Sequence, residues 1–383
     1  MTVKLGDICS FQSGGTPSKT NADYFFGDIP WITTVALNGQ VIGKTAAVDW
    51  ITGKAIEESA AKIVPARSIM VGTRVGVGKV AINEIPMSTS QDIISLVGIN
   101  ESLWNKEFLC KFIQSKETYL KSQARGATIK GIKIDVLASL DIPDVPFDSQ
   151  KEIVAAFDKV QNILAARRSQ LSALDDLIKV RFIEMFGDQE SNPFHYKVGT
   201  LKDVSDIFLG LTHTPTYVDK GRPFISVRDI SSGSIDFSNC HYITEEEFQS
   251  LPNGAKPKAN DLLFCRVGTI GKPVIVPEET PEFGSFVSVG FLRRKSNVFN
   301  EYLKAWMDNP FFMKQVYDNV AGASQINLNT GWLKNFRILI PPLEKQNQFA
   351  TFVKQVDKSK SVIQKSLDET RLLFDSLMQK YFG

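Results

Sequence analysis

The sequence contains few of the residues that build metal sites or disulfides. Its 383 residues include only four cysteines and three histidines. They are Cys9, Cys110, Cys240, Cys265, His195, His213 and His241. No two cysteines form a CxxC pair, and only Cys240 and His241 are adjacent, which is poor geometry for a shared ion. We therefore expect no metal site and no disulfide.

The sequence also lacks long apolar runs and a strong charge of either sign. No run approaches the length of about 20 residues that crosses a bilayer. The stretch MTVKLGDICSFQSGG lacks the basic start and apolar core of a signal peptide. We expect a cytoplasmic protein without membrane contacts. The net charge of +2 permits nucleic-acid binding but does not argue for it.

Motifs of catalysis are missing as well. The stretch GTRVGVGK resembles a phosphate loop, but Gly72 and Gly78 are too far apart and Val80 stands where Ser or Thr is needed. Residues 68–82 instead predict a β-hairpin with a glycine turn. The DNPF stretch at 308–311 lacks the second proline of an amino-methyltransferase loop. We predict no catalytic residue and no cofactor in this chain.

The sequence does contain an internal repeat. Phe186 and Gly187 recur as Phe382 and Gly383, at an offset of 196 positions. Further pairs at this offset are Leu5 and Leu201, Asp7 and Asp203, Leu137 and Leu333, Pro146 and Pro342, Gln150 and Gln346, Val160 and Val356, and Leu171 and Leu367. The chain therefore contains two copies of one structural plan.

Each copy combines a globular part with a long helix. Turn residues and β-branched residues alternate in the first part, whereas the second is charged and free of proline. We predict globular parts at 1–147 and 191–341 and helices at 148–190 and 342–383. Ser149 and Glu152 fit a capping box at the first boundary. The expected class is α+β, with two mixed α/β domains.

The helices carry a heptad pattern. Because 196 is a multiple of seven, both helices keep the same seam. The apolar seam positions are Ile153, Phe157, Val160, Leu164, Leu171, Leu174, Ile178, Phe349, Val353, Val356, Ile363, Leu367, Phe374 and Leu377. Arg167 and Lys360 interrupt it. We predict an antiparallel coiled coil around a pseudo-twofold axis, about 57 Å long at 1.5 Å per residue. Two amphipathic helices, each packed on its own domain, are the alternative.

The repeat slips inside the globular parts. The Arg-Val-Gly triplets that begin at Arg74 and Arg266 align at an offset of 192, and the Gly-Lys pairs that follow align at 193. The two copies thus share one offset near their ends, while the residues inside their globular parts align at other offsets. This favours one scaffold that carries two recognition surfaces with different targets.

Four further features stand out: the stretch LGDICSFQSGGTPSKTNADYFFGDIPWIT (5–33), the two RVG hairpins, the Gly-Ala pairs at 126 and 322, and IPPLEKQ (340–346). In these features the chain resembles the specificity (S) subunit of type I restriction–modification enzymes. The resemblance covers nearly the whole chain, including the two-copy plan. The first copy departs from the pattern at Val145 and Phe147, which replace residues of the usual Pro-Pro-Leu.

The resemblance implies a non-catalytic subunit. Each globular part is then a target-recognition domain that reads one half of a split double-stranded DNA sequence. The helices set the spacing and dock two methyltransferase (M) subunits, which bind S-adenosylmethionine. Restriction (R) subunits, with ATP and Mg²⁺, join the full complex. A helix of about 57 Å spans roughly 17 base pairs, which suits two separated half-sites.

Base reading needs polar side chains on exposed loops. In the first domain the candidates for DNA contact are Thr16, Ser18, Lys19, Thr33, Thr34, Arg74, Lys79, Arg125 and Lys130. In the second domain they are Thr214, Thr216, Arg228, Arg266, Lys272, Gln325, Asn327 and Asn329. Two other functions stay open: a coiled-coil scaffold that binds only proteins, and a self-sufficient methyltransferase or nuclease.

Overall fold

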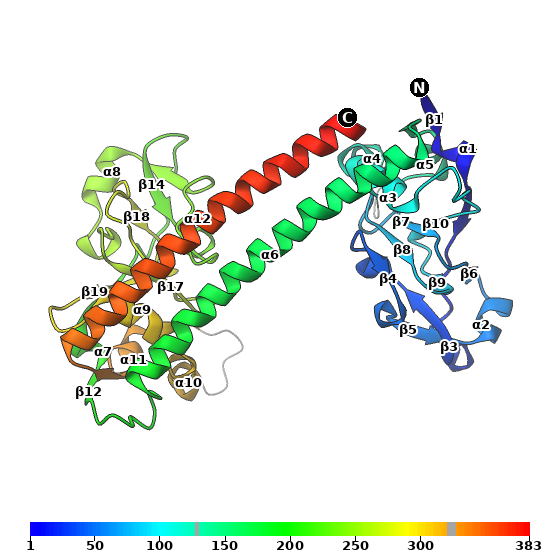
Figure 1. Ribbon diagram of the computed structural model, residues 1–383. Coiled ribbons are helices and arrows are strands. Elements are labelled where there is room, and N and C mark those ends of the chain that lie inside the picture. Colours follow the sequence, from blue (N-terminus) through cyan, green and yellow to red (C-terminus); the bar gives the residue numbers. More distant parts are fainter. Residues whose placement is uncertain (127–129, 320–326) are drawn as a thin grey trace. The chain divides into compact units, whose positions relative to one another are not determined.

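The protein consists of two compact units. The computed structural model describes residues 1–126, 130–319 and 327–383. The first unit contains Met1–Arg167 and Ser366–Gly383, and the second contains Arg168–Lys365. Two long helices, α6 (Phe147–Phe186) and α12 (Leu343–Phe382), each contribute residues to both units (Figure 1).

The first unit is built mainly from short strands. The strands are β1 (Thr2–Lys4), β2 (Ser10–Ser13), β3 (Phe25–Ile32), β4 (Val41–Ile42), β5 (Asp49–Ile51), β6 (Ile63–Val64), β7 (Ile69–Gly72), β8 (Val80–Asn83), β9 (Met87–Thr89), β10 (Ile93–Val97) and β11 (Asp141–Pro143). The helices, besides the long ones, are α1 (Leu5–Ile8), η1 (Ala22–Tyr24), η2 (Thr34–Ala36), η3 (Lys44–Ala46), α2 (Gly53–Glu58), α3 (Lys106–Ser115), α4 (Glu117–Gln123) and α5 (Ile134–Ala138).

The second unit follows the same plan. Its strands are β12 (Lys197–Thr200), β13 (Ser205–Leu209), β14 (Arg222–Ile225), β15 (His241–Ile243), β16 (Leu262–Cys265), β17 (Gly271–Ile275), β18 (Gly284–Ser285), β19 (Val289–Arg294) and β20 (Arg337–Ile340). Its further helices are α7 (Leu201–Val204), η4 (Val227–Asp229), α8 (Glu245–Ser250), η5 (Asn253–Ala255), α9 (Asn300–Asp308), α10 (Pro310–Asn319) and α11 (Thr330–Leu333).

The sheets of the two units correspond strand by strand. The order β2-β10-β7-β8 in the first unit matches β13-β19-β16-β17 in the second, and β5-β3-β9 matches β15-β14-β18. The first unit adds β4 and β6 at the edges. The predicted hairpin is present in both units, because β7 pairs antiparallel with β8 and β16 with β17. The internal repeat is therefore a repeat of topology.

The strand register corrects one predicted alignment. Ile69 pairs with Ile82, and 193 positions later Leu262 pairs with Ile275. The offset is thus 193 in both paired strands, up to a register shift between Leu263 and Cys265, and the match of the Arg-Val-Gly triplets at 192 is wrong by one residue. Arg266 corresponds to Thr73 rather than to Arg74. A shift of one residue in a strand turns a side chain to the opposite face.

Close backbone packing explains the glycine pair at the end of β2. The Gly14 N–H donates to the carbonyl of Ile93 at 3.0 Å, and the Gly15 N–H donates to that of Thr89 at 2.9 Å. A Cβ atom at Gly15 would lie 2.1 Å from the Ala60 carbonyl oxygen. A larger residue would therefore push the two sheets of the first unit apart.

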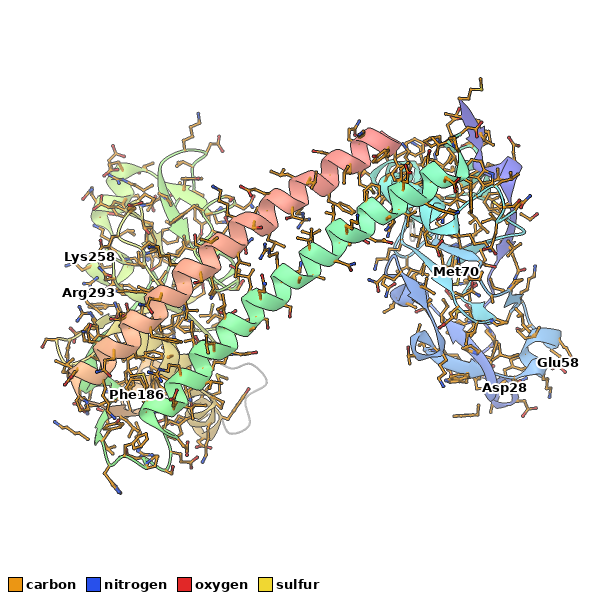
Figure 2. The ribbon with its side chains drawn as sticks, in the orientation of Figure 1. Asp28, Glu58, Met70, Phe186, Lys258 and Arg293 are labelled. Carbon is orange, nitrogen blue, oxygen red and sulfur yellow. The ribbon has the colours of Figure 1, made fainter. Side chains whose placement is uncertain are left out.

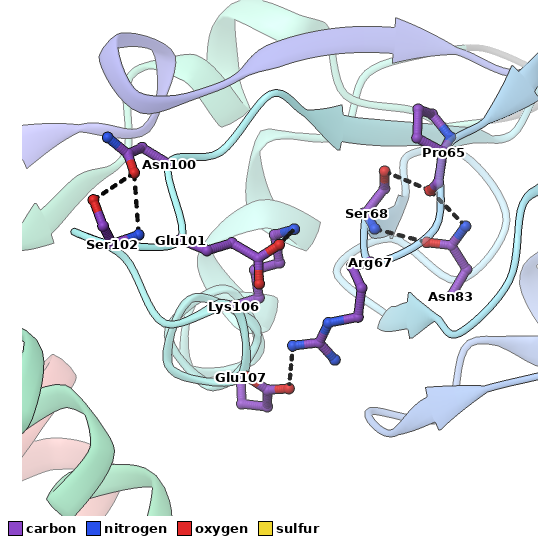
Figure 3. A network of polar contacts seen from close by, with 9 residues as sticks. All are labelled: Pro65, Arg67, Ser68, Asn83, Asn100, Glu101, Ser102, Lys106 and Glu107. Carbon is purple, nitrogen blue, oxygen red and sulfur yellow. Dashed lines mark hydrogen bonds and ion pairs between the residues drawn. The ribbon is translucent and has the colours of Figure 1, made fainter.

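The turn before β7 is fixed by a buried amide (Figure 3). The Asn83 Oδ1 atom accepts from the Ser68 N–H at 2.8 Å, and its Nδ2 group donates to the Pro65 carbonyl at 2.7 Å. Between these residues Arg67 has a positive φ of 61° and pairs with Glu107 at 2.8 Å. The amide thus holds a strained turn in place.

The matching turn of the second unit uses a carboxylate. Asp261 accepts from the Lys258 N–H at 2.8 Å and from the Arg293 guanidinium at 2.9 and 2.7 Å. Lys258 and Arg293 are labelled in Figure 2. Asn260 has a φ of 67°, a conformation that asparagine tolerates better than arginine does. The same turn is therefore built from different residues in the two units.

Aromatic side chains anchor the long helices to the globular parts. In the first unit Phe382, from the end of α12, stacks on Phe157 with 5.7 Å between ring centroids and packs on Phe108 at 5.3 Å. In the second unit Phe186, from the end of α6, packs on Tyr302 at 4.9 Å. Burying one such ring contributes roughly 1.5–3 kcal/mol. The phenylalanines of the repeated Phe-Gly endings are therefore core residues.

The predicted seam is buried. Every apolar seam position is buried or half-buried. In the first unit Phe157 of α6 packs on Phe374 near the end of α12, at 5.4 Å. In the second unit Phe182 near the end of α6 packs on Phe349 near the start of α12, at 5.6 Å, and Lys360 pairs with Asp175 at 2.5 Å. The two helices are antiparallel in each unit.

The helix boundaries differ slightly from those predicted. The helix predicted at 148–190 is α6 at Phe147–Phe186, and the one predicted at 342–383 is α12 at Leu343–Phe382. Ser149 lies inside the helix and does not cap it, because the Gln150 N–H already donates to the Pro146 carbonyl at 3.0 Å. At the other end Gly187, with a φ of 71°, stops α6.

The predicted fold class is confirmed, with two mixed α/β globular parts and two long helices. Each long helix has 40 residues, which corresponds to about 60 Å at 1.5 Å per residue. None of the helices in the described part of the chain has the length and apolar character needed to span a bilayer.

Candidate nucleic-acid interface

In the first unit the candidate residues lie mostly on exposed loops. Those with exposed side chains are Thr16, Ser18, Lys19, Arg74, Lys79, Arg125 and Lys130. Thr33 is half-buried, and Thr34 is 5% exposed inside η2. Thr34 therefore cannot present its hydroxyl to a partner without a change in the turn.

Backbone hydrogen bonds bring two of these residues together. The Arg125 N–H donates to the Gly131 carbonyl at 2.9 Å, and the Gly131 N–H donates back at 3.0 Å. The Ile132 N–H donates to the Thr73 carbonyl at 2.8 Å, beside Arg74. A Cβ atom at Gly131 would lie 2.9 Å from the Arg74 Cγ atom. The glycine therefore allows the arginine stem to lie against Gly131.

A pocket opens at this junction. It has a volume of about 560 Å³ and is lined by Arg74, Gln123, Arg125, Gly131, Ile132, Lys133 and Val136. Sequence reasoning selected Arg74 and Arg125 but missed Gln123 and Lys133. The sequence shows only that Lys133 stands two positions after Gly131. The pairing of Gly131 with Arg125 comes from the structure.

In the second unit three candidates lie on neighbouring loops. Thr214, Thr216 and Arg228 are all exposed. Arg228 is the middle residue of η4, where its guanidinium contacts Asp229 at 3.2 Å and the Asn239 carbonyl at 3.1 Å. The Thr216 N–H donates to Glu247 at 3.1 Å.

An aromatic pair that the sequence reasoning missed lies near Thr216 and Arg228. The rings of Tyr217 and His241 stack with 4.0 Å between centroids, and both residues are exposed. Burial raises the pKa of Tyr217, and the charge of Arg228 opposes this shift. Tyr217 directly follows the candidate Thr216, but its stacking partner comes from β15, which sequence spacing could not indicate.

Arg266 is not placed to read a base. It is 9% exposed, and its guanidinium donates to the carbonyls of Leu328 at 3.0 Å and Val287 at 2.7 Å and to the Asn327 Oδ1 atom at 3.3 Å. Burial lowers the pKa of its guanidinium. The hairpin register is the cause, because it turns Arg266 inward.

Three of the remaining candidates of the second unit have exposed side chains. They are Lys272, in β17, and Asn327 and Asn329, which precede α11. Asn329 caps α11 by accepting from the Gly331 N–H at 2.7 Å. Gln325 lies outside the described residues. Direct contact to DNA by any of these candidates stays a prediction.

The cysteines are poor nucleophiles in this structure. Burial raises the pKa of Cys9 to about 12 and that of Cys265 to about 11. The pKa values of Cys110 and Cys240 are raised for the same reason. All four are therefore thiols at neutral pH. Within residues 1–126, 130–319 and 327–383, no three His, Cys, Asp or Glu side chains form a group that could hold a metal ion.

Comparison with known protein families decides the relationship. The family model described as "Type I restriction modification DNA specificity domain" matches residues 1–173 and 193–370. The chain belongs to this family. The two matched segments correspond to the two copies of the repeat, so the predicted relationship to type I specificity subunits is confirmed.

Some relatives of this specificity-domain chain match it over most of their length. The chain is 25% identical to the type I restriction enzyme MjaIX specificity subunit of Methanocaldococcus jannaschii, over 98% of this chain and 91% of that protein. A solved type I restriction–modification S subunit from M. genitalium is similar in fold, with a TM-score of 0.55 at 14% identity, over 100% of this chain and 96% of that chain.

A second solved structure supports the same fold for this specificity-domain chain. It comes from work on complex assembly and conformational transition of the type I restriction–modification system, and its TM-score is 0.61 at 17% identity. The match covers 100% of this chain and 97% of that chain. The likeness in fold thus extends over both globular parts and both long helices.

Proposed function

We propose that this chain is the DNA-specificity subunit of a type I restriction–modification complex. Each globular part reads one half of a bipartite double-stranded DNA target, and the long helices hold the two parts at a set spacing. The chain is not catalytic by itself. It works in the cytoplasm with two methyltransferase subunits, and restriction subunits complete the assembly.

One observation supports this proposal above the others. The two units have the same sheet topology and equivalent buried aromatic anchors. They nevertheless expose different residues at matching positions. The middle residue of η2 is Val35, whereas the middle residue of η4 is Arg228. On the strands beside them, Asp49 pairs with Trp31 in β3, and His241 pairs with Phe224 in β14. One scaffold with two different surfaces is what reading two different half-sites requires.

The helices offer surfaces for the methyltransferase subunits. On α6 in the second unit, Leu177 is 45% and Val180 61% exposed, and on α12 in the first unit, Leu372 is 67% and Leu373 51% exposed. Leu177 and Leu373 occupy the same position in the two copies. Exposed apolar residues that gather in a patch mark protein contacts, and each helix has two of them close together. The repeat of one leucine in both copies suits two copies of one partner.

The cofactors belong to the partners in this proposal. S-adenosylmethionine binds the methyltransferase subunits, and ATP and Mg²⁺ bind the restriction subunits. The raised pKa values of all four cysteines support a chain without thiolate chemistry.

The test is a genome-wide map of methyladenine in a cell that carries this gene and its methyltransferase gene. Deletion of this gene should erase methylation at one split motif, and the lost motif identifies both half-sites. An unchanged map in a cell with active methylation would contradict the proposal and favour a scaffold that binds only proteins. Methylation of DNA by the purified chain alone would instead favour a self-sufficient enzyme.

A further inference from the structure

The pocket of the first unit gathers positive charge from three separate segments. Arg74 follows β7, Arg125 follows α4, and Lys133 precedes α5. The hydrogen bonds between Arg125 and Gly131, and between Ile132 and Thr73, hold these segments together. The grouping is therefore a property of the backbone and does not depend on flexible side chains meeting by chance.

This charge is not neutralised within the unit. Arg74, Arg125 and Lys133 are exposed, and none of them forms an ion pair in the described part of the chain. The described residues that line the pocket include no Asp or Glu. Three cations around one concave surface favour the binding of an anion.

The chemistry of the lining favours a phosphate group over a base. A flipped or unpaired base is usually held by an aromatic ring, and no aromatic residue lines the pocket. Two guanidinium groups and an ammonium group match phosphate oxygens, because arginine presents paired N–H donors in a plane.

The matching pocket of the second unit has a different chemistry. It has a volume of about 320 Å³ and is lined by Gln315, Asp318, Asn319, Gly331, Trp332, Asn335 and Phe336. Asn319 and Trp332 correspond to Gln123 and Val136 of the first pocket. None of the described residues that line it is Lys or Arg, and the position of Arg74 is taken by Val267. Between these two matching pockets, as far as their described residues go, the cationic lining thus belongs to the first.

We propose that this cationic pocket, defined by Arg74, Arg125 and Lys133, is a phosphate-binding site for the DNA backbone beside the first half-site. The inference rests on the proposed function. It assigns a positioning role to the pocket, because phosphate contacts fix register without carrying sequence. It also means that the two half-sites are held unequally, with a stronger electrostatic contact at the first.

The experiment uses the complex with its methyltransferase subunits and a DNA duplex with the motif found by the methylation map. Affinity is measured between 50 and 300 mM KCl. Each phosphate contact contributes about 0.9 to the slope of log K against log salt. The R74Q/R125Q double variant should bind about tenfold or more weakly at 100 mM salt, with a slope shallower by about 1.8. The R74K/R125K variant, which keeps the charge, should retain the wild-type slope.

Two controls separate the possible failures. N319A, in the matching pocket of the second unit, should leave the slope unchanged. Neutral methylphosphonate linkages beside the first half-site should weaken wild-type binding but cause no further loss in R74Q/R125Q.

The outcomes distinguish the two proposals. If wild type does not discriminate its motif from scrambled DNA, the proposed function fails. If wild type discriminates and R74Q/R125Q keeps its affinity and slope, or changes only base preference, the pocket assignment alone is overturned. K133Q repeats the test should the double variant unfold.

Discussion

The side chain of Gln346 joins the start of α12 to the residue before α9, because its Oε1 atom accepts from the Phe299 N–H at 2.9 Å. Its Nε2 group donates to the Pro341 carbonyl at 2.8 Å. Gln150 makes the same pair of contacts in the first unit, to the Asn105 N–H at 2.8 Å and the Val145 carbonyl at 3.0 Å. Each long helix is thus tied to its globular part by one buried amide.

Removal of this amide should destabilise the second unit. Gln346 is fully buried, so Gln346→Met leaves the Phe299 N–H without its acceptor, at a cost of about 1–3 kcal/mol. Chemical denaturation of the chain measures the change. Gln348→Met is the matched control, because Gln348 is exposed on the same helix, and it should change stability by less than about 0.5 kcal/mol. Equal effects of the two substitutions would show that the buried contact contributes little.

Replacement of Phe26 by asparagine is expected to stabilise the folded protein. Phe26 has a φ of 63° and is 94% exposed, at an irregularity between Phe25 and Ile29 in the pairing of β3 with β5. A left-handed conformation costs a residue with a side chain about 1–2 kcal/mol, and asparagine is among the residues that tolerate it best. Phe26→Asn should therefore raise the melting temperature. A fall in melting temperature would mean that the ring makes a stabilising contact after all.

Much of the fold could be predicted from the sequence because the repeat and the heptad seam are regular over long distances. The register of the hairpins could not. Strands β7 and β16 are buried on both faces, so they show no alternation of polar and apolar residues that would fix the face of each side chain. The Arg-Val-Gly triplets then suggested the wrong alignment by one position, and Arg266 was assigned to the surface.

The candidate site was only partly predictable for a related reason. Arg74 and Arg125 stood out as basic residues beside glycine turns. Lys133 belongs with them because the Ile132 N–H donates to the Thr73 carbonyl, and a contact between residues so far apart in the sequence leaves no mark on local sequence. In the same way, the ring of Tyr217 stacks on that of His241, which belongs to strand β15.

Arg266 and Arg74 should respond differently to the same substitution. Arg266→Met leaves the Val287 and Leu328 carbonyls without their donor and is expected to destabilise the second unit by about 2 kcal/mol or more. Arg74→Met, at an exposed position, should change stability by less than about 0.5 kcal/mol while it weakens DNA binding. Thermal unfolding and DNA affinity are measured on both variants. A stable Arg266→Met protein with weak DNA binding would instead indicate that Arg266 reaches the DNA.

The exposed leucines on the helices should matter for assembly and not for folding. Leu177→Glu and Leu373→Glu each place a charge on one patch, so the double variant should fold normally but lose both methyltransferase subunits. Size-exclusion chromatography with light scattering measures the mass of the complex. Ser172→Glu, at an exposed polar position on α6, is the control and should assemble fully. Full assembly of the double variant would place the partner contact elsewhere.

The two recognition domains should be separable by exchange. The core of the first unit combines Leu5, Phe108 and Ile142 from residues 1–147 with Phe157 and Phe382 from the long helices, so replacement of residues 1–147 by a corresponding part of another specificity subunit that packs on these two retained rings should preserve its fold and leave the second unit unchanged. The methylation map of the chimera should then keep one half of the original motif and change the other. A motif altered in both halves would mean that the two surfaces read DNA as one, and the duplicated scaffold would need a different explanation. Retention of the spacing between the half-sites would in turn locate the determinant of spacing in α6 and α12, since both helices are left intact by the exchange apart from the first residue of α6.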